Sequence, residues 1–317
     1  MVQYKTKQNT KEGTHVIEFH TPRIEDLAWA DPCLKAVPRQ ACEYSFTNLL
    51  GWSGPYGQEI ARWGDLLLTR LQGPLNGCYL WPAGAGDERA AIEALAADAG
   101  ERGCPLRLVA VPAGDKDKLE AWWPGRFHIT PDRDGFDYCY GIDKMCELTG
   151  KKLHGKRNHI NRFLEANEGR WSFAPMTRPQ LAECLEMEAE WRRRSLGREV
   201  SLEEFSPETT ALLAAATHYD ALGMDGGVLR VYGEVVAFTM GTLLTPDTYD
   251  IHFEKAYGEL QGAYPMIARQ FARLIRDKYP GVRWLNREDD MGVEGLRKAK
   301  ESYYPDLMIE KFTVLEK

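Results

Sequence analysis

The stretch TYDIHFEKAYGELQGAYPMIARQFARLI, residues 248–275, decides the fold class. Its first nine residues are rich in aromatic and β-branched side chains and predict a strand. A loop with two glycines, 257–262, follows this strand. Pro265 then stands in the first turn of a helix whose apolar residues recur at helical spacing, namely Tyr264, Ile267, Phe271, Leu274 and Ile275. The stretch therefore predicts a strand, a glycine-bearing loop and a helix in direct succession.

A second unit of this kind lies in the first half of the chain. It consists of CYLWP (78–82), AGAGD (83–87) and a helix from residue 88 that Asp87 can cap. Around both units the sequence predicts the same order of elements. Antiparallel strands precede the glycine-bearing loop, and a strand, a helix and a further strand follow the unit. These flanking predictions include a strand at 15–20, one long helix over 143–166 and one strand over 307–315. We therefore predict an α+β fold of two similar halves, with a tail at 1–14, a first domain at 15–145 and a second domain at 146–317.

Composition and charge limit the classes of function. Of the 317 residues, 44% are apolar and 27% are charged, which is ordinary for a globular protein with a sizeable core. The longest apolar run, 211–216, is far shorter than a membrane helix, and the N-terminus has no apolar signal region. The net charge of −7 argues against general nucleic-acid binding. We expect a soluble, cytoplasmic protein with reduced cysteines and no metal site.

Three stretches resemble one bacterial family: KKLHGKRNHINRF (151–163), IHFEKA…QGAYPMI (251–267) and LNREDDMGVEGLRKAKESYYPDLMIEKF (285–312). They are similar to soluble proteins related to the C-terminal domain of phosphatidylglycerol lysyltransferases. With CEYSFTNLLGW (42–52) and DRDGFDYCYG (132–141), the likeness runs from about residue 17 to the end. The segment GLRKAKESYYP is similar to a signature of those enzymes and departs from it at Ala299, Ser302 and Tyr303.

This resemblance implies two tandem GNAT (Gcn5-related acetyltransferase) domains, the acyl-CoA N-acyltransferase fold, with the active cleft in the second copy. Lysyltransferases and Fem-type enzymes with this body move an amino acid from charged tRNA to an amine or hydroxyl acceptor. The sequence lacks a membrane-embedded half, so transfer to a lipid is not expected. Tandem pairing also covers sheet edges, which favours a monomer.

We therefore expect aminoacyl transfer from aminoacyl-tRNA to a small amine-bearing acceptor, without a tightly bound cofactor. Two alternatives stay open. One is N-acyl transfer from acyl-CoA, and the other is a non-catalytic binding protein on a degenerate GNAT scaffold.

Candidate catalytic residues lie on the strand that opens the second unit. Asp250, His252 and Glu254 alternate along it, so their side chains are expected to share one face. A carboxylate or imidazole beside the acceptor can deprotonate the amine that attacks the acyl group. The alternative is a solvated face of an edge strand. We take Glu254 as the base or the amine-binding carboxylate, with His252 as a further catalytic candidate.

Further candidates follow the next strand. Asn286 and Glu288 stand in a polar loop at its end and are candidates for substrate binding, unless the loop is only a solvated turn. Lys298 and Lys300 lie on the following predicted helix and are candidates to bind a phosphate or carboxylate. Resemblance to GNAT enzymes implies that Tyr303 donates a proton to the leaving group. The alternative is a surface helix with one tyrosine in the core.

A basic segment, 151–162, holds five Lys and Arg residues and no acid. Such a run is most often a solvated face, but the missing acids favour phosphate contact by Lys152, Lys156, Arg157 and His159. The partner that this implies is the acceptor end of tRNA. The glycine loop at 258–263 lacks the spacing of a pyrophosphate-binding CoA loop. The loop at 83–87 is closer in shape, but Asp87 at the helix start would repel a phosphate, so both loops favour a donor other than CoA.

Overall fold

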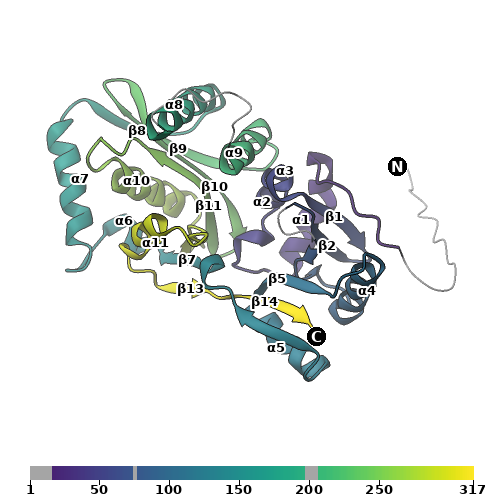
Figure 1. Ribbon diagram of the computed structural model, residues 1–317. Coiled ribbons are helices and arrows are strands. Elements are labelled where there is room, and N and C mark those ends of the chain that lie inside the picture. Colours follow the sequence, from purple (N-terminus) through teal and green to yellow (C-terminus); the bar gives the residue numbers. More distant parts are fainter. Residues whose placement is uncertain (1–15, 74–76, 197–205) are drawn as a thin grey trace.

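The structure, a computed structural model, describes residues 16–73, 77–196 and 206–317. The predicted tail at 1–14 lies outside these residues. Two mixed β-sheets with mainly antiparallel pairing lie side by side, and helices flank each of them (Figure 1). The α+β class that the sequence predicts is confirmed.

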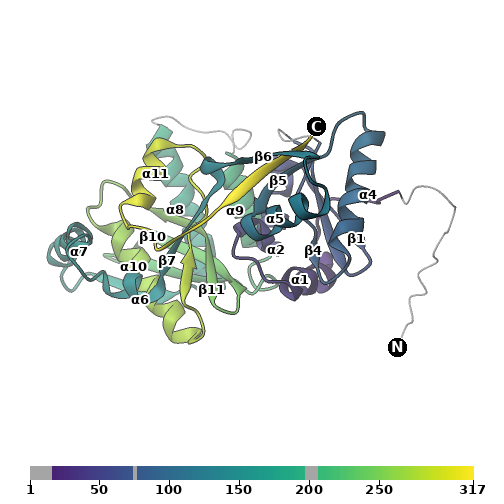
Figure 2. The same cartoon turned by 90° about the horizontal axis from the view of Figure 1, so that it is seen from below.

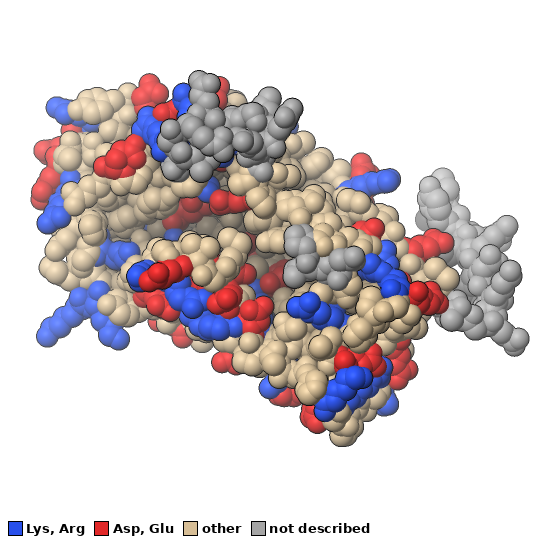
Figure 3. Space-filling model, viewed as in Figure 1, with Lys and Arg blue, Asp and Glu red and all other residues tan. Residues whose placement is uncertain are grey.

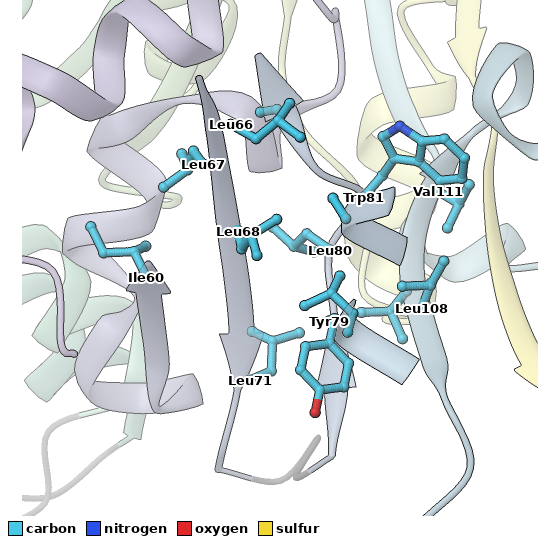
Figure 4. Close-up of a cluster of buried hydrophobic side chains, with 14 of the residues drawn as sticks. Ile60, Leu66, Leu67, Leu68, Leu71, Tyr79, Leu80, Trp81, Leu108 and Val111 are labelled. Atoms are coloured by element: carbon cyan, nitrogen blue, oxygen red, sulfur yellow. The ribbon is translucent and has the colours of Figure 1, made fainter. Parts of the chain in front are cut away.

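The first sheet has the strand order β1-β2-β3-β5-β14-β6, and β4 pairs with β2. Its core is built around β2, which is buried at five of six positions because helices cover both faces (Figure 4). The strands are β1 (Gln58–Trp63), β2 (Leu66–Leu71), β3 (Cys78–Tyr79), β4 (Ala83–Gly84), β5 (Arg107–Pro112), β6 (Phe127–Pro131) and β14 (Lys311–Glu316). The helices of this half are η1 (Ile24–Asp26), α1 (Leu27–Ala36), η2 (Cys42–Tyr44), α2 (Phe46–Gly51), α3 (Ser53–Tyr56), α4 (Glu88–Glu101), α5 (Ala113–Trp122) and η3 (Arg133–Gly135).

The second sheet has the order β13-β7-β12-β11-β10-β9-β8. Helices α6, α7 and α10 pack on one of its faces, and α8 and α9 pack on the other. The strands are β7 (Asp137–Gly141), β8 (Trp171–Pro175), β9 (Asp225–Val231), β10 (Glu234–Thr245), β11 (Thr248–Ala256), β12 (Trp284–Asn286) and β13 (Leu307–Ile309). The helices are α6 (Ile142–Glu147), α7 (His154–Ala166), α8 (Arg178–Leu196), α9 (Pro207–Thr217), α10 (Ala263–Lys278) and α11 (Glu294–Glu301). Within the described ranges, none of these helices has the length and apolar character needed to span a bilayer.

Two segments cross from one sheet to the other and tie the halves together (Figure 2). β6 and β14 pair antiparallel in the first sheet, and β7 and β13 pair antiparallel in the second. The single strand predicted over 307–315 is therefore two strands, because the chain changes sheets at Glu310. The two sheets also do not divide at residues 145–146, where the sequence predicts the domain boundary. β7 precedes this point but belongs to the second sheet, and β14 follows it but belongs to the first.

The single helix predicted over 143–166 is also two elements, α6 and α7. Leu148 has a φ of 50° and Gly150 a φ of 88°, so the chain leaves the helix in a left-handed turn. The Arg157 guanidinium donates to the carbonyls of Leu148 and Gly150, the latter at 2.8 Å, and holds this turn. The strand predicted at 15–20 is wrong over its described part, 16–20, where the only ladder contact is a bridge from His20 to Ile60.

β11 and β12 diverge after a short parallel pairing. They pair over three residues, ending at Asp250 with Asn286. β12 stops there, whereas β11 continues to Ala256 and pairs with β10 on its other side. The edge of β11 beyond Asp250 is therefore open, and this opening positions the cavity described next.

Candidate active site

A cavity of about 660 Å³ lies where β11 and β12 diverge, between the two halves. The space-filling view shows a hollow near the middle of this face with acidic side chains inside it (Figure 3). The second half lines the cavity with parts of β11, the loop after β12, α7, α10 and α11. Sequence reasoning assigns the cleft to the second half and misses the lining residues of the first, which are Cys42, Glu43, Asn48, Trp52, Tyr56 and Gln58.

A β-bulge in β11 changes which of its side chains share a face. His252 has no partner in the ladder with β10, because the residues on either side of it pair with consecutive residues of that strand. Ile251 accordingly packs in the apolar cluster around α10, while Phe253 packs in the cluster around α8 and α9. The alternation thus shifts by one residue, and the prediction that Glu254 shares a face with Asp250 and His252 is wrong. His252 and Glu254 both still line the cavity.

Glu254 forms a cluster with one arginine, one lysine and one tyrosine. Its Oε1 accepts a hydrogen bond from Arg287 Nη2 at 2.8 Å, and its buried Oε2 receives none from any residue in the described ranges. The ring of Tyr303 lies 5.0 Å from the Arg287 guanidinium and 3.9 Å from the Lys156 ammonium. Burial, together with the neighbouring Arg287 charge, lowers the pKa of Lys156 to about 8. Burial also raises the pKa of the Tyr303 phenol, so this group stays protonated at neutral pH.

His252 stands at the centre of a second cluster. Its Nδ1 lies 3.1 Å from Glu288 Oε1 and 3.5 Å from Asp250 Oδ2, and its Nε2 lies 2.8 Å from Thr242 Oγ1. Asn48, from the first half, donates to the same Glu288 oxygen at 3.0 Å. Asp250 is fully buried, and this burial together with the Glu288 charge raises its pKa well above the usual range. The structure therefore brings together His252 and Glu288, two candidates from different elements, at one wall of the cavity.

Lys300 lines the cavity, but its ammonium is directed at the protein backbone. It donates to the carbonyls of Arg287, Glu288 and Asp289, the second of these at 3.1 Å. Glu288 has a φ of 56°, a left-handed conformation that costs energy in a residue with a Cβ. Burial lowers the pKa of Lys300. In this arrangement Lys300 stabilises the turn that presents Glu288 to the cavity.

Asn286 is fully buried behind the cavity and is not among its lining residues. Its amide nitrogen donates to the Gln40 carbonyl at 2.8 Å and to Asp137 at 3.1 Å, and its oxygen accepts from the Glu288 N–H at 2.7 Å. Of the candidates Glu254, Asn286 and Lys300, the first and last line the cavity and Asn286 does not. Asn286 instead connects the loop to the first half.

The other predicted binding residues lie outside the cavity, with one exception. Lys298 is exposed and pairs with the acid four residues earlier in α11, at 2.5 Å. Lys152 and His159 are exposed around α7, and Arg157 holds the preceding turn. Lys156 alone among the basic-segment candidates lines the cavity.

A buried ammonium that sequence reasoning missed ties the last strand to the cavity wall. Lys311 Nζ lies 2.6 Å from Asp137, 2.7 Å from Glu43 and 3.5 Å from the Cys42 sulfur, and its side chain is 1% exposed. Burial raises the pKa of Glu43 to about 7, against the opposing effect of Lys311. The one signal in the sequence is a lysine within the otherwise mostly apolar LMIEKFTVL segment.

Comparison with known proteins gives a family and a fold. Residues 34–315 match the family model described as "Phosphatidylglycerol lysyltransferase, C-terminal". A conserved protein of unknown function from Bacteroides thetaiotaomicron is 35% identical, with a TM-score of 0.86 over 95% of this chain and 100% of that chain. No protein of curated function matches the sequence significantly.

More distant structures share the fold. One is a C-terminal domain ascribed to a lysylphosphatidylglycerol synthetase of Agrobacterium fabrum, 13% identical, with a TM-score of 0.65 over 92% of either chain. Another is FemX, 9% identical, with a TM-score of 0.57 over 94% of this chain and 97% of that chain. The tandem GNAT-like fold implied by the sequence resemblance is confirmed. Since the family match spans nearly all of the two sheets, the chain belongs to the family of the phosphatidylglycerol lysyltransferase C-terminal domain.

Proposed function

We propose that the protein is an acyltransferase that moves an aminoacyl group from aminoacyl-tRNA to a small amine-bearing acceptor in the cavity between its halves. The observation that carries this proposal is the open edge of β11 beside a carboxylate with one unengaged oxygen, Glu254 Oε2. Family membership supports acyl transfer in general, and the chemistry of the lining residues supports the finer assignment.

Glu254 acts on the acceptor amine in this proposal. Arg287 holds one oxygen of the carboxylate, and the other is free to accept a proton or an ammonium N–H. The amine nitrogen attacks the ester carbonyl carbon, the C–N bond forms, and Glu254 takes the proton that the nitrogen loses. Backbone N–H groups on the open edge of β11 are placed to stabilise the oxyanion. Glu43, Glu288 and Asp289 also line the cavity, and their carboxylates attract a cationic acceptor.

Tyr303 and Lys156 act on the leaving group. The ester C–O bond breaks as the amide forms, and the departing ribose oxygen needs a proton. Tyr303 can supply it because its phenol is protonated at neutral pH. Lys156 lies against the same ring and is the cation best placed to contact the adjacent phosphate of the tRNA terminus.

The loop before α10 supports tRNA over CoA as the donor. Gly262 packs so closely on α7 that a Cβ there would lie 2.2 Å from the His159 carbonyl oxygen. The N–H of Ala263, at the helix start, already donates to the Leu260 carbonyl at 3.1 Å. A CoA pyrophosphate needs open backbone N–H groups at a helix start of this kind.

The test uses tRNA aminoacylated with isotope-labelled amino acids and a panel of small amines. We expect amine-dependent loss of label from tRNA and its recovery in an amide, detected by mass spectrometry. Glu254→Gln should slow this transfer by about 10²–10³-fold, whereas Glu294→Gln, an exposed change on α11, should not slow it. Label retained on tRNA with every amine would contradict the proposal, and acylation of the same amines by acyl-CoA would favour the alternative donor.

A further inference from the structure

Asp250, His252 and Glu288 offer three ligand atoms that lie within 4.8 Å of one another. Asp250 is fully buried, and neither of its carboxylate oxygens accepts a hydrogen bond from any described residue. For both carboxylates, the ion pair found among the described residues is with the same atom, His252 Nδ1. A buried carboxylate without hydrogen-bond donors is costly, so this arrangement calls for a further positive group.

The contacts of the His252 imidazole are compatible with a metal ion on Nδ1. The Thr242 hydroxyl lies 2.8 Å from Nε2 and can accept its proton, and in that tautomer Nδ1 carries a lone pair. That lone pair then faces Glu288 Oε1 at 3.1 Å. A lone pair and a carboxylate oxygen repel each other at this distance unless a cation lies between them.

A neighbouring cluster shows what a satisfied site of this kind looks like in the same protein. Cys42, Glu43 and Asp137 also bring three ligand atoms within 4.8 Å. Lys311 Nζ already lies among them, at 2.6 Å from Asp137 and 2.7 Å from Glu43. A protein ammonium thus fills the cluster around Cys42. In the cluster around His252, by contrast, no lysine or arginine of the described ranges forms an ion pair.

We propose that Asp250, Nδ1 of His252 and Glu288 bind one divalent first-row transition-metal ion, with Zn²⁺ as the best match. One imidazole and two carboxylates are donors that Zn²⁺ accepts, at about 2.0–2.2 Å from each ligand atom. Two ligands on one such ion lie about 3.0–3.5 Å apart for angles between octahedral and tetrahedral. The observed separations are 3.1 Å from His252 Nδ1 to Glu288 and 3.5 Å to Asp250.

The surroundings of these three residues suit a metal site. Thr242 orients the imidazole, and Asn48 orients the Glu288 carboxylate from the other half of the molecule. His252 and Glu288 line the cavity, so an ion has a path from solvent. The bound ion would lie in the wall of the candidate active site, and Asn48 of the first half would be hydrogen-bonded to one of its ligands.

The experiment measures metal binding and needs no knowledge of a substrate. The full chain is stripped with EDTA, freed of the chelator and titrated with ZnCl₂ by calorimetry, and Co²⁺ is added in parallel as an optical probe. We expect one Zn²⁺ per chain and visible Co²⁺ absorption typical of a site with a nitrogen ligand. Asp250→Asn, His252→Asn and Glu288→Gln should each weaken Zn²⁺ binding by about 100-fold or more, since even residues behind the ligands are worth about 10–100-fold. Glu288 is partly exposed, so its variant tests the site even if Asp250→Asn does not fold.

Two controls separate this site from others. His159→Gln removes an exposed imidazole, and Cys42→Ser alters the neighbouring cluster; both should keep the parent affinity. The proposal is overturned if the parent chain binds no stoichiometric Zn²⁺, which would mean that a proton stabilises Asp250 instead. It is equally overturned if Glu288→Gln binds as tightly as the parent, or if Cys42→Ser abolishes binding.

Discussion

Arg287 Nη2 donates to Glu254 Oε1 at 2.8 Å, and the second oxygen of this carboxylate is buried and receives no hydrogen bond from the described residues. Glu254 raises the pKa of Arg287 although burial opposes this, so the guanidinium remains charged. The pair therefore holds one carboxylate oxygen beside the cavity and leaves the other for a ligand. In the proposed function, this carboxylate has both a structural and a chemical role.

Glu254→Gln should consequently lower stability as well as activity. The substitution leaves the Arg287 guanidinium with a neutral partner in a largely buried position. We expect the free energy of unfolding to fall by about 1–3 kcal/mol in urea titrations. Arg287→Gln combined with Glu254→Gln should cost less than the sum of the two single changes. Glu294→Gln breaks an exposed pair and should change stability by less than about 0.5 kcal/mol. Equal stability of the Glu254 and Glu294 variants would contradict the structural role.

Lys311→Met should be among the most destabilising single changes in the protein. It removes the ammonium that pairs with Asp137 and Glu43 and leaves two carboxylates buried beside each other. Breaking a buried pair in this way costs about 3–5 kcal/mol. The matched control is Lys298→Met, which removes an exposed lysine from α11 and should leave unfolding nearly unchanged. A Lys311→Met protein with parent-like urea unfolding would show that β14 does not need this contact.

The elements of the fold that depend on local pattern could be predicted from the sequence. Residues 248–275 form a strand, a loop and a helix as predicted, because apolar periodicity and the early Pro265 are local signals. The broken elements could not be predicted in the same way. Glu310 lies between two strands of different sheets, and nothing in its local sequence differs from a strand interior. Leu148 ends a helix without the glycine that usually marks such an end.

The candidate site shows the same limit. Glu254 and Lys300 line one cavity because β11 continues past the end of β12 and the chain after β12 leads into α11, a strand order that can be inferred from the fold. The bulge at His252 depends on packing against β10, which has no sequence signal. Lys156 enters the cavity from a helix whose other cations are exposed, and a charge run does not tell which of its members faces inward. The contribution of Asn48 depends on how the halves meet.

Lys156 should make stability depend on pH in a defined direction. Its pKa is about 8 in the folded protein and about 10.5 in the unfolded chain, so between these values the unfolded state binds more protons. Stability of the parent should therefore rise relative to Lys156→Met as pH increases from 8 to 10.5, and the ammonium should cost its full penalty below pH 8. We expect a change of about 1–2 kcal/mol in the difference between the two proteins, allowing for partial solvent screening. Lys152→Met, which removes an exposed ammonium outside the cavity, is the matched control. A difference that stays constant across this range, or that changes in the opposite direction, would contradict the placement of Lys156.

Binding of tRNA should depend on salt through the exposed end of the basic segment. Lys151 and Lys152 are exposed before α7, whereas Arg157 is engaged with backbone carbonyls and Lys156 faces the cavity. Each exposed lysine that contacts a phosphate contributes about 0.7–0.9 to the slope of log K against log salt. The double change Lys151→Gln and Lys152→Gln should thus flatten this slope by about 1.4–1.8 in filter-binding measurements.

Arg157→Gln should instead act mainly on stability, because it releases the turn at Leu148 and Gly150. Lys278→Gln, an exposed change at the far end of α10, should leave the slope unchanged. Undetectable tRNA binding by the parent at low salt would remove the support for tRNA as the donor, and an unchanged slope in the double variant would move the tRNA contact away from this segment.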